Sequence, residues 1–332
     1  MTMNFKEGRW NHEINVTDFV KLNITPYEGD ASFLAGPTER TKAVWNKCLE
    51  ALAEERANNG VRSLDPSTVS TITSFAPGYI DKENEVIVGL QTDELLRRAI
   101  KPFGGIKVVE KACRENGVEV DPKVKDIFTH YRKTHNDGVF DAYTEEIRSF
   151  RSLGFLTGLP DNYARGRIIG DYRRLALYGL DRLIEAKQND LRHLTGPMTD
   201  ARIRLREEVA EQIKALKEIK IMGEQYGLDL SRPATNAREA VQWVYMAYLA
   251  AVKEQDGAAM SLGNVSSFLD IYIEYDMAHN GLDELHAQEL IDQFVIKLRM
   301  VRHLRMQAYT DIFAGDPTWV TEAIGGRFND GR

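Results

Sequence analysis

Four arginines lie close together between Gly154 and Tyr178, among glycines, aromatic residues and two aspartates; they are Arg165, Arg167, Arg173 and Arg174. A guanidinium presents a fixed fork of N–H donors that binds a carboxylate or a phosphate through two hydrogen bonds. Glycines let the backbone and a ligand approach each other closely. The stretch therefore suggests an anion site. The alternative, which composition alone favours, is that these arginines pair with neighbouring acids such as Asp161 and Asp171.

The remaining reactive residue types show no spacing typical of a metal or nucleotide site. Cys48 and Cys113 are far apart, so they predict neither a disulfide framework nor a metal site. Cys48 lies within a helical pattern and has no neighbouring histidine, so we interpret it as a small buried apolar residue. His130 and His135 are five positions apart, whereas two ligands on one helix face need a spacing of four. No metal site is expected.

Composition and charge restrict the kinds of partner that the chain can have. A chain of 332 residues can bury a sizeable core in one large domain or two smaller ones. The formal charge of −7, with acids and bases interspersed, argues against nucleic acid as the main partner. No apolar run approaches the roughly 20 residues that span a bilayer. The N-terminus has no secretory signal pattern, and a cytoplasmic location without membrane contact is expected.

Helical periodicity predicts most of the secondary structure. Apolar residues recur at helical spacing over 39–58, 107–116, 121–132, 175–186, 199–226, 236–252 and 283–306, and the last is expected to be the longest helix. A helix is also predicted over 93–100. Residues 68–80 predict a strand or an extended loop, and 268–276 alternate as a strand does, although a helix is also compatible. The chain is therefore expected to be mainly helical with a minority of strands.

Several long segments, taken together and in order, resemble the pyruvate formate-lyase (formate acetyltransferase) family of glycyl-radical enzymes. They read TPYEGDASFLAG, STITS, PFGGIK, YRKTHNDGVFDAYT, LTGLPDNYARGRIIGDYRRLALYG, PATNAREAVQWVY, YLAAVKEQDGAAMS and FAGDPTWVTEAIGG. The likeness runs from about Asn15 to the last residue. A series of long motifs in one order is far more specific than any single motif.

The resemblance implies a helix-rich α/β fold, namely the N-terminal part of a ten-stranded barrel made of two antiparallel half-barrels wrapped by helices. Residues 1–150 would form a helical and loop-rich outer part, and 151–332 an incomplete half-barrel with the substrate pocket. The family consists of cytoplasmic homodimers of pyruvate metabolism and anaerobic glucose fermentation. They convert pyruvate and coenzyme A to acetyl-coenzyme A and formate. A separate radical-SAM activating enzyme installs a glycyl radical, which passes to a cysteine, and no prosthetic group or metal is bound.

By the same resemblance, residues of this chain match the family's pyruvate pocket. Arg167 matches the residue that grips the pyruvate carboxylate, while Ala258, Phe313 and Trp319 match small and aromatic residues of the pocket wall. A guanidinium fork beside glycine suits a small carboxylate. Apolar walls would keep a radical intermediate dry and oriented.

Two further positions match the coenzyme A site of the family. Phe140 and Arg151 correspond to the surface where the adenine docks. Ser152 stands where a basic residue can occur in the family, which weakens this assignment.

The chain also departs from the family. It has no Cys-Cys dipeptide, Cys48 and Cys113 match neither catalytic cysteine, and the radical-bearing glycine loop is missing. No catalytic residue is therefore assigned, and we expect a chain that is inactive alone: a fragment, a truncated gene product or one piece of a split enzyme. The alternatives are a non-catalytic dimerisation or interaction fragment, and a related glycyl-radical enzyme acting on 2-ketobutyrate. An arginine fork favours a 2-oxo acid over a diol.

Overall fold

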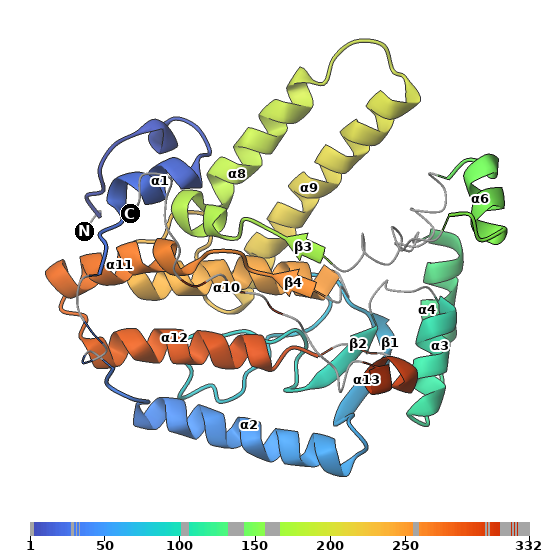
Figure 1. The fold of residues 1–332 in the computed structure, drawn as a ribbon, viewed down its shortest axis with the longest axis horizontal. Helices are drawn as coiled ribbons and strands as arrows, with labels where there is room; N and C mark the ends of the chain where they lie inside the picture. The colour runs from blue at the N-terminus through green and yellow to red at the C-terminus, as the bar shows by residue number, and fades with distance from the viewer. Residues whose placement is uncertain are drawn as a thin grey trace.

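The computed structural model of the chain describes residues 3–27, 30, 32, 34–100, 106–131, 143–156, 167–254, 259–302, 304, 306–312, 320, 322 and 324. At 167–169, 259, 309, 310 and 312 it describes the backbone alone. Helices dominate this part of the chain (Figure 1): α1 (Val16–Asn23), α2 (Glu39–Ala57), α3 (Ile106–Glu115), α4 (Pro122–Asp126), α6 (Glu145–Ser152), α8 (Arg173–His193), α9 (Asp200–Gln225), α10 (Ala237–Glu254), α11 (Ser266–His279), α12 (Glu284–Arg299) and α13 (Gln307–Ile312).

The core is built around α10, which packs against α8, α9, α11 and α12 (Figure 1). Its residues Val241, Val244, Met246, Tyr248 and Leu249 are completely buried. A helix that is apolar around most of its circumference must be covered on all sides, which explains its central place. Helices α8, α9, α11 and α12 therefore surround α10.

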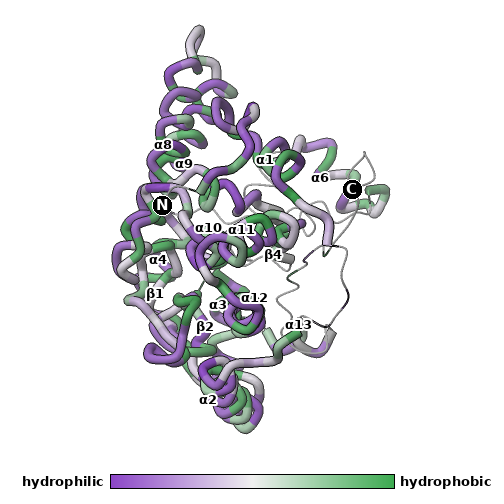
Figure 2. Tube along the Cα trace, turned by 90° about the vertical axis from the view of Figure 1, so that its left-hand side faces the viewer, coloured by the Kyte–Doolittle hydropathy of each residue, from purple (hydrophilic) through white to green (hydrophobic). Residues whose placement is uncertain are grey.

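A long antiparallel hairpin of α8 and α9 extends from this body, and hydrophilic residues prevail along its outer part (Figure 2). Near the base of α8, Gly179 has a φ of +70°. There the N–H of Leu180 donates to the carbonyl of Leu230 at 2.9 Å. A Cβ on Gly179 would lie 2.4 Å from the carbonyl carbon of Arg232, so only glycine permits this approach.

The strands form two small parallel pairs. Strand β1 (Ser63–Val69) pairs with β2 (Arg97–Ile100), and β3 (Arg167–Ile169) pairs with β4 (Ala259–Ser261). Parallel strands need a crossover connection. The connection from β3 to β4 contains α8, α9 and α10, whereas residues 70–96 between β1 and β2 form no helix. An isolated parallel bridge joins Gly263, just after β4, to Glu322.

Several predicted elements are confirmed. Helices occur over 39–57, 106–115 and 200–225, close to the predicted ranges. The side chain of Thr199 caps α9 by accepting from the N–H of Arg202, and α9 ends at Gln225, before Tyr226 and Gly227. The oxygen of Asn236 accepts from the N–H of Glu239 at 2.8 Å, as expected of an N-cap.

Two predictions were wrong, and one choice left open by the sequence is decided. Residues 93–100 do not form a helix: Arg97–Ile100 is strand β2, because its pairing with β1 buries Ala99 and Ile100 completely. Residues 268–276, compatible with a strand or a helix, belong to helix α11; Phe268, Leu269 and Tyr272 share a buried helical stripe. The longest helix among the described residues is α9, since α12 ends at Arg299.

Candidate functional site

Three segments that lie far apart in the sequence meet at one narrow strip of backbone, which we call the β3–β4 strip: β3, β4 and Glu322. Arg167 is opposite Ala259, and Ile169 is opposite Ser261. Two residues beyond β4, Gly263 is bridged to Glu322. Figure 1 shows β3 and β4 side by side next to α10. The arginine stretch, the small-residue segment before α11 and the C-terminal segment are therefore brought together.

Most of the predicted site residues lie outside the described part of the chain. Arg167 is the first residue of β3, and its backbone alone is described. The structure does not describe Ala258, Phe313, Trp319 or Phe140, nor Arg165 and Asp161 of the arginine stretch. Their predicted roles stay predictions.

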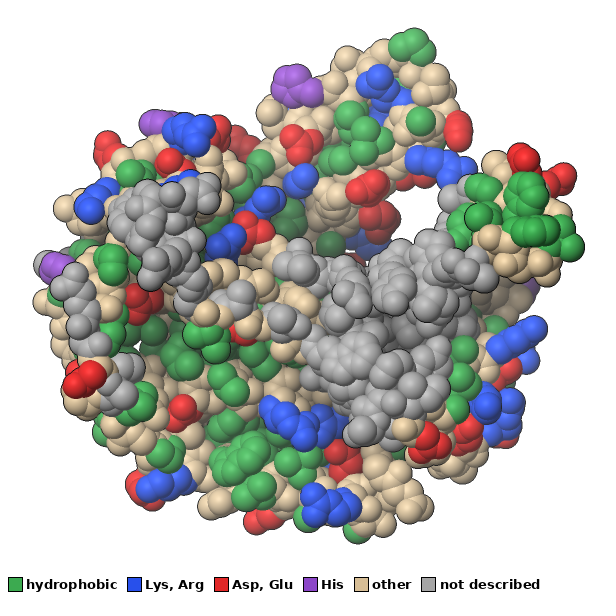
Figure 3. Space-filling model, in the orientation of Figure 1, with side chains coloured by type: hydrophobic (Ala, Val, Ile, Leu, Met, Phe, Trp, Pro, Cys, Tyr) green, Lys and Arg blue, Asp and Glu red, His purple; other side chains and the backbone are tan. Residues whose placement is uncertain are grey.

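Arg151 is described and lies in α6. Its guanidinium carbon is 5.6 Å from the centre of the Tyr143 ring, a distance typical of a cation–π contact. Apolar side chains of α6 and of the turn after it are exposed, including Phe150, Leu153 and Phe155. Figure 3 shows a green patch over α6. The predicted coenzyme A surface thus combines a cation with exposed apolar area.

The remaining arginines of the stretch form ion pairs with one aspartate. Nε of Arg173 lies 2.7 Å from Oδ1 of Asp171, and Nε of Arg174 lies 3.5 Å from its Oδ2. Nη1 of Arg173 also donates to the carbonyl of Asn264 at 3.1 Å, in the turn after β4. For these two arginines, ion pairing is confirmed.

Glu322 joins the same turn from the other side. Its Oε1 accepts hydrogen bonds from the N–H groups of Val265 at 2.9 Å and Ser266 at 3.2 Å. These donors open helix α11, whose N-cap residue, Val265, has no capping side chain. Burial raises the pKa of Glu322, while these hydrogen bonds and the charge of Arg173 oppose the rise. A negatively charged carboxylate near a helix N-terminus also interacts favourably with the helix dipole.

Sequence reasoning missed Glu322. Its hydrogen-bond partners are 56 and 57 residues away in the sequence, so no local spacing predicts the contact. The other signal was its place in the segment FAGDPTWVTEAIGG, which had already drawn attention through the family resemblance.

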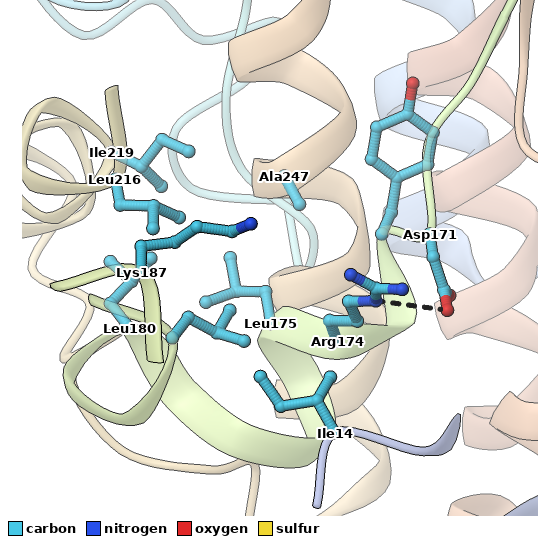
Figure 4. Close-up of a pocket in the computed structure, with 11 residues that line it drawn as sticks. Ile14, Asp171, Arg174, Leu175, Leu180, Lys187, Leu216, Ile219 and Ala247 are labelled. Atoms are coloured by element: carbon cyan, nitrogen blue, oxygen red, sulfur yellow. Dashed lines mark ion pairs between the residues drawn. The ribbon is translucent and has the colours of Figure 1, made fainter. Parts of the chain in front are cut away.

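A separate cavity of about 200 Å³ lies between α8, α9 and α10 (Figure 4). Its walls are mainly apolar, with Leu175, Leu216 and Ile219 among them. Its two cationic side chains are both in ion pairs, Arg174 with Asp171 and Lys187 with Asp190 at 3.1 Å. Because both cations already have an acidic partner, the cavity is poorly suited to bind a small carboxylate.

Both cysteines are completely buried. Burial raises the pKa of the Cys48 thiol to about 12 and that of Cys113 to about 11. A thiolate is the nucleophilic form, so neither residue is poised as a nucleophile. The interpretation of Cys48 as a buried apolar residue is confirmed.

The part of the chain that the structure describes contains neither a metal-binding cluster nor a membrane-spanning helix. No three His, Cys, Asp or Glu side chains there are grouped so that they would hold a metal ion. Among the same residues, none of the helices has the length and apolar character needed to cross a bilayer.

Comparison of the fold with solved structures finds similar architecture in other enzymes. The structure is similar to the B12-independent glycerol dehydratase from Clostridium butyricum, with a TM-score of 0.64 and 17% identity, over 91% of this chain and 45% of the other. It is similar to hydroxyproline dehydratase from Clostridioides difficile, with a TM-score of 0.64 and 14% identity, over 90% of this chain and 44% of the other. At such low identity the likeness shows the fold alone. The expected fold class, a helix-rich α/β part of the glycyl-radical-enzyme barrel, is confirmed.

Sequence comparison is more specific. The chain is 56% identical over 333 aligned residues to the formate acetyltransferase of Haemophilus influenzae (strain ATCC 51907 / DSM 11121 / KW20 / Rd). The alignment covers 99% of this chain but 43% of that protein, so the chain spans less than half the length of the curated relative. The family model described as "Pyruvate formate lyase-like" matches residues 6–332. Since that match takes in nearly the whole sequence, the chain belongs to the pyruvate formate lyase-like family.

Proposed function

We propose that this chain is the substrate-binding N-terminal part of a formate C-acetyltransferase. The complete enzyme would be an acyltransferase that converts pyruvate and coenzyme A to acetyl-coenzyme A and formate through glycyl and thiyl radicals. Membership of the family and 56% identity to a formate acetyltransferase support this proposal.

The observation that carries the proposal is the pairing in the β3–β4 strip. Arg167 is opposite Ala259, the residue that follows Ala258, and Gly263 is bridged to Glu322, three positions after Trp319. Three of the segments that the resemblance assigns to the pyruvate pocket thus have their described residues next to one another. A site assembled in this way is what a small substrate requires, because its contacts must converge from several segments.

In the proposed site, Arg167 binds the carboxylate of pyruvate through two parallel N–H···O bonds. Ala258 leaves room for the substrate beside the strand, and Phe313 and Trp319 form an apolar wall. Such a wall excludes water, which strengthens the ion pair and holds the carbonyl carbon in a fixed orientation. Ion pairing already occupies Arg173 and Arg174.

The radical steps belong to residues outside this sequence. The 332 residues contain no adjacent pair of cysteines. The thiols of Cys48 and Cys113 are buried in the core. These residues would therefore bind and orient pyruvate, while a Cys-Cys pair and a radical glycine outside the 332 residues perform the chemistry.

The remaining parts of the proposal concern partners. Coenzyme A, as co-substrate, would dock its adenine near Phe140 and Arg151; the exposed apolar area on α6 supports a stacking surface there. A radical-SAM activating enzyme would act on the complete enzyme, which would be a cytoplasmic homodimer.

Calorimetric titration of the chain with pyruvate tests the substrate-binding role. We expect wild-type protein to bind pyruvate, Arg167→Ala to lose binding, and Arg167→Lys to bind more weakly, because an ammonium lacks the planar fork. Arg174→Ala is the matched control: this arginine lies in the same stretch but is committed to Asp171. Equal binding by wild type and Arg167→Ala would refute the role of Arg167. Titrations with 2-ketobutyrate and glycerol in parallel define the substrate class.

Reconstitution tests the enzymatic role. The chain is mixed under anaerobic conditions with a polypeptide corresponding to the remaining part of the Haemophilus relative and with an activating enzyme, and formate is measured. Formate production that depends on Arg167 is expected. Failure with folded partners that form a complex would count against a split enzyme.

A further inference from the structure

Glu322 makes the contact that closes the β3–β4 strip on its C-terminal side. One carboxylate oxygen accepts from two successive backbone N–H groups, those of Val265 and Ser266. The same residue bridges Gly263 through its backbone. Glu322 therefore holds the turn 263–266 through its side chain and its main chain together.

Arg173 contacts the same turn. This arginine follows β3 in the sequence, and its Nη1 donates to the carbonyl of Asn264 at 3.1 Å. Its Nε is fixed by Asp171. The turn after β4 thus contacts both a cation that follows β3 and an anion from the C-terminal segment.

Two backbone N–H groups at this turn, those of Val265 and Ser266, have an acceptor far away in the sequence, whereas the N–H of Ser267 donates locally to Oδ1 of Asn264 at 3.5 Å. A helix begins with N–H groups that have no partner within the helix. Val265 has no side-chain oxygen, so it provides no cap for α11. Glu322 supplies the missing acceptor from a residue 57 positions away. The second oxygen, Oε2, is buried and has no hydrogen-bond partner among the described residues. Because this oxygen gains no hydrogen bond from its burial, the position of Glu322 is explained by its other contacts, those with Val265, Ser266 and Gly263.

From this arrangement we infer that Glu322 is a positioning residue for the 2-oxo-acid site: it fixes the turn 263–266 and, through β4, the strand that begins with Arg167. The inference rests on the proposed function, in which Arg167 binds the carboxylate. Glu322 itself touches neither substrate nor reacting atoms in this role. Its loss would loosen the backbone that sets the direction of the Arg167 fork.

The test compares variants of Glu322 with a control at the N-terminus of α12. Glu322→Ala removes the acceptor, and Glu322→Asp, shorter by one methylene, moves it out of reach of the two N–H groups. Glu322→Gln keeps an acceptor oxygen at the same length. The control is Asp283→Ala, which removes the side-chain cap of α12, where Asp283 accepts from the N–H of His286 at 2.8 Å. It removes a carboxylate cap of the same kind from a helix that bears none of the residues proposed to bind substrate.

Two measurements are made on each variant: pyruvate affinity by calorimetry, and hydrogen exchange of backbone amides by mass spectrometry. Glu322→Ala and Glu322→Asp should exchange faster over 259–266 and bind pyruvate about tenfold more weakly, the effect of losing one or two hydrogen bonds. Glu322→Gln should restore affinity to within about twofold of wild type. Asp283→Ala should leave both the exchange over 259–266 and the affinity unchanged.

Unchanged exchange over 259–266 in Glu322→Ala would overturn the inference, whatever the affinity. Faster exchange with wild-type affinity would overturn the link to substrate. Equal weakening by Asp283→Ala would also overturn it, since the effect would then be general loss of stability. A wild-type chain that binds no pyruvate would refute the proposed function and the substrate part of this inference, while hydrogen exchange would still decide whether Glu322 fixes the turn.

Discussion

The ammonium nitrogen of Lys297 lies 2.9 Å from Oε2 of Glu85, and both side chains are excluded from solvent. The two groups form an ion pair in the core. The other oxygen of Glu85 accepts from the N–H groups of Ile80 and Asp81. The pair therefore ties α12 to the loop that precedes β2. Burial lowers the pKa of Lys297, and the charge of Glu85 opposes this shift.

Breaking this pair from one side should be costly. We expect Lys297→Met to lower the free energy of unfolding by about 3–5 kcal/mol, because it leaves a buried carboxylate without a counter-charge. Urea denaturation followed by circular dichroism measures the change. The double variant Glu85→Gln/Lys297→Met should recover much of the loss, since the neutral amide still accepts from the backbone. Lys220→Met, which breaks an exposed pair with Asp181, is the control and should have little effect. Equal effects of the two lysine variants would contradict the prediction.

The cysteines should be unreactive in the folded protein. Burial raises the pKa of Cys48 to about 12 and that of Cys113 to about 11, so almost no thiolate is present at pH 8. We expect iodoacetamide to label neither residue appreciably in native protein and both residues in urea. Mass spectrometry of tryptic peptides measures the labelling. Rapid stoichiometric labelling of native Cys48 would be incompatible with its burial in the core.

The carboxyl group of Asp270 should destabilise the fold at neutral pH. Burial holds its pKa above the ordinary value of 3.8. Between 3.8 and the folded-state pKa, the folded protein binds more protons than the unfolded chain, so stability falls as pH rises through this window. Asp270→Asn should therefore raise the free energy of unfolding at pH 7, and the gain should shrink as pH approaches 3.8.

Asp283 gives the control of opposite sign for this pH dependence. Its hydrogen bonds with the backbone and side chain of His286 lower its pKa, so its contribution is present above 3.8 and lost as pH falls through the folded-state pKa. Asp283→Asn should lose stability at pH 7 and less at low pH. Urea denaturation at pH 4 and pH 7 measures both variants. If the change in the free energy of unfolding had the same sign and the same pH dependence in both variants, burial would not be the cause of the raised pKa of Asp270.

Gly179 should tolerate no side chain. Alanine would have to adopt a φ of about +70° and would place Cβ 2.4 Å from the carbonyl carbon of Arg232. We expect Gly179→Ala to lower the free energy of unfolding by about 2–5 kcal/mol, from backbone strain and overpacking together. Gly227→Ala isolates the strain, because φ there is +75° and nothing lies within 4 Å of the added Cβ. It should cost about 1–2 kcal/mol. Equal losses in the two variants, measured by urea denaturation, would mean that the contact with Arg232 is unimportant.

The sequence by itself determined the elements whose stability is local. The apolar period over 200–225 and the cap at Thr199 predicted α9 with its ends, because helical hydrogen bonds and caps join residues three or four positions apart. Long motifs in a fixed order likewise determined the family. The residue types of the arginine stretch showed that a carboxylate site was chemically possible, although composition alone favoured ion pairing with neighbouring acids such as Asp171.

Only the tertiary structure decided what depends on contacts between distant residues. Arg97–Ile100 became a strand because β1 pairs with it, and the alternating residues 268–276 became a helix because the core receives one helical stripe. Asp171 pairs with Arg173 and Arg174, and the backbone of Arg167 begins β3 opposite Ala259. Glu322 acquired its partners 56 and 57 residues away. Strand register and long-range caps cannot be predicted from local sequence patterns, because each depends on a partner residue that is distant in the sequence.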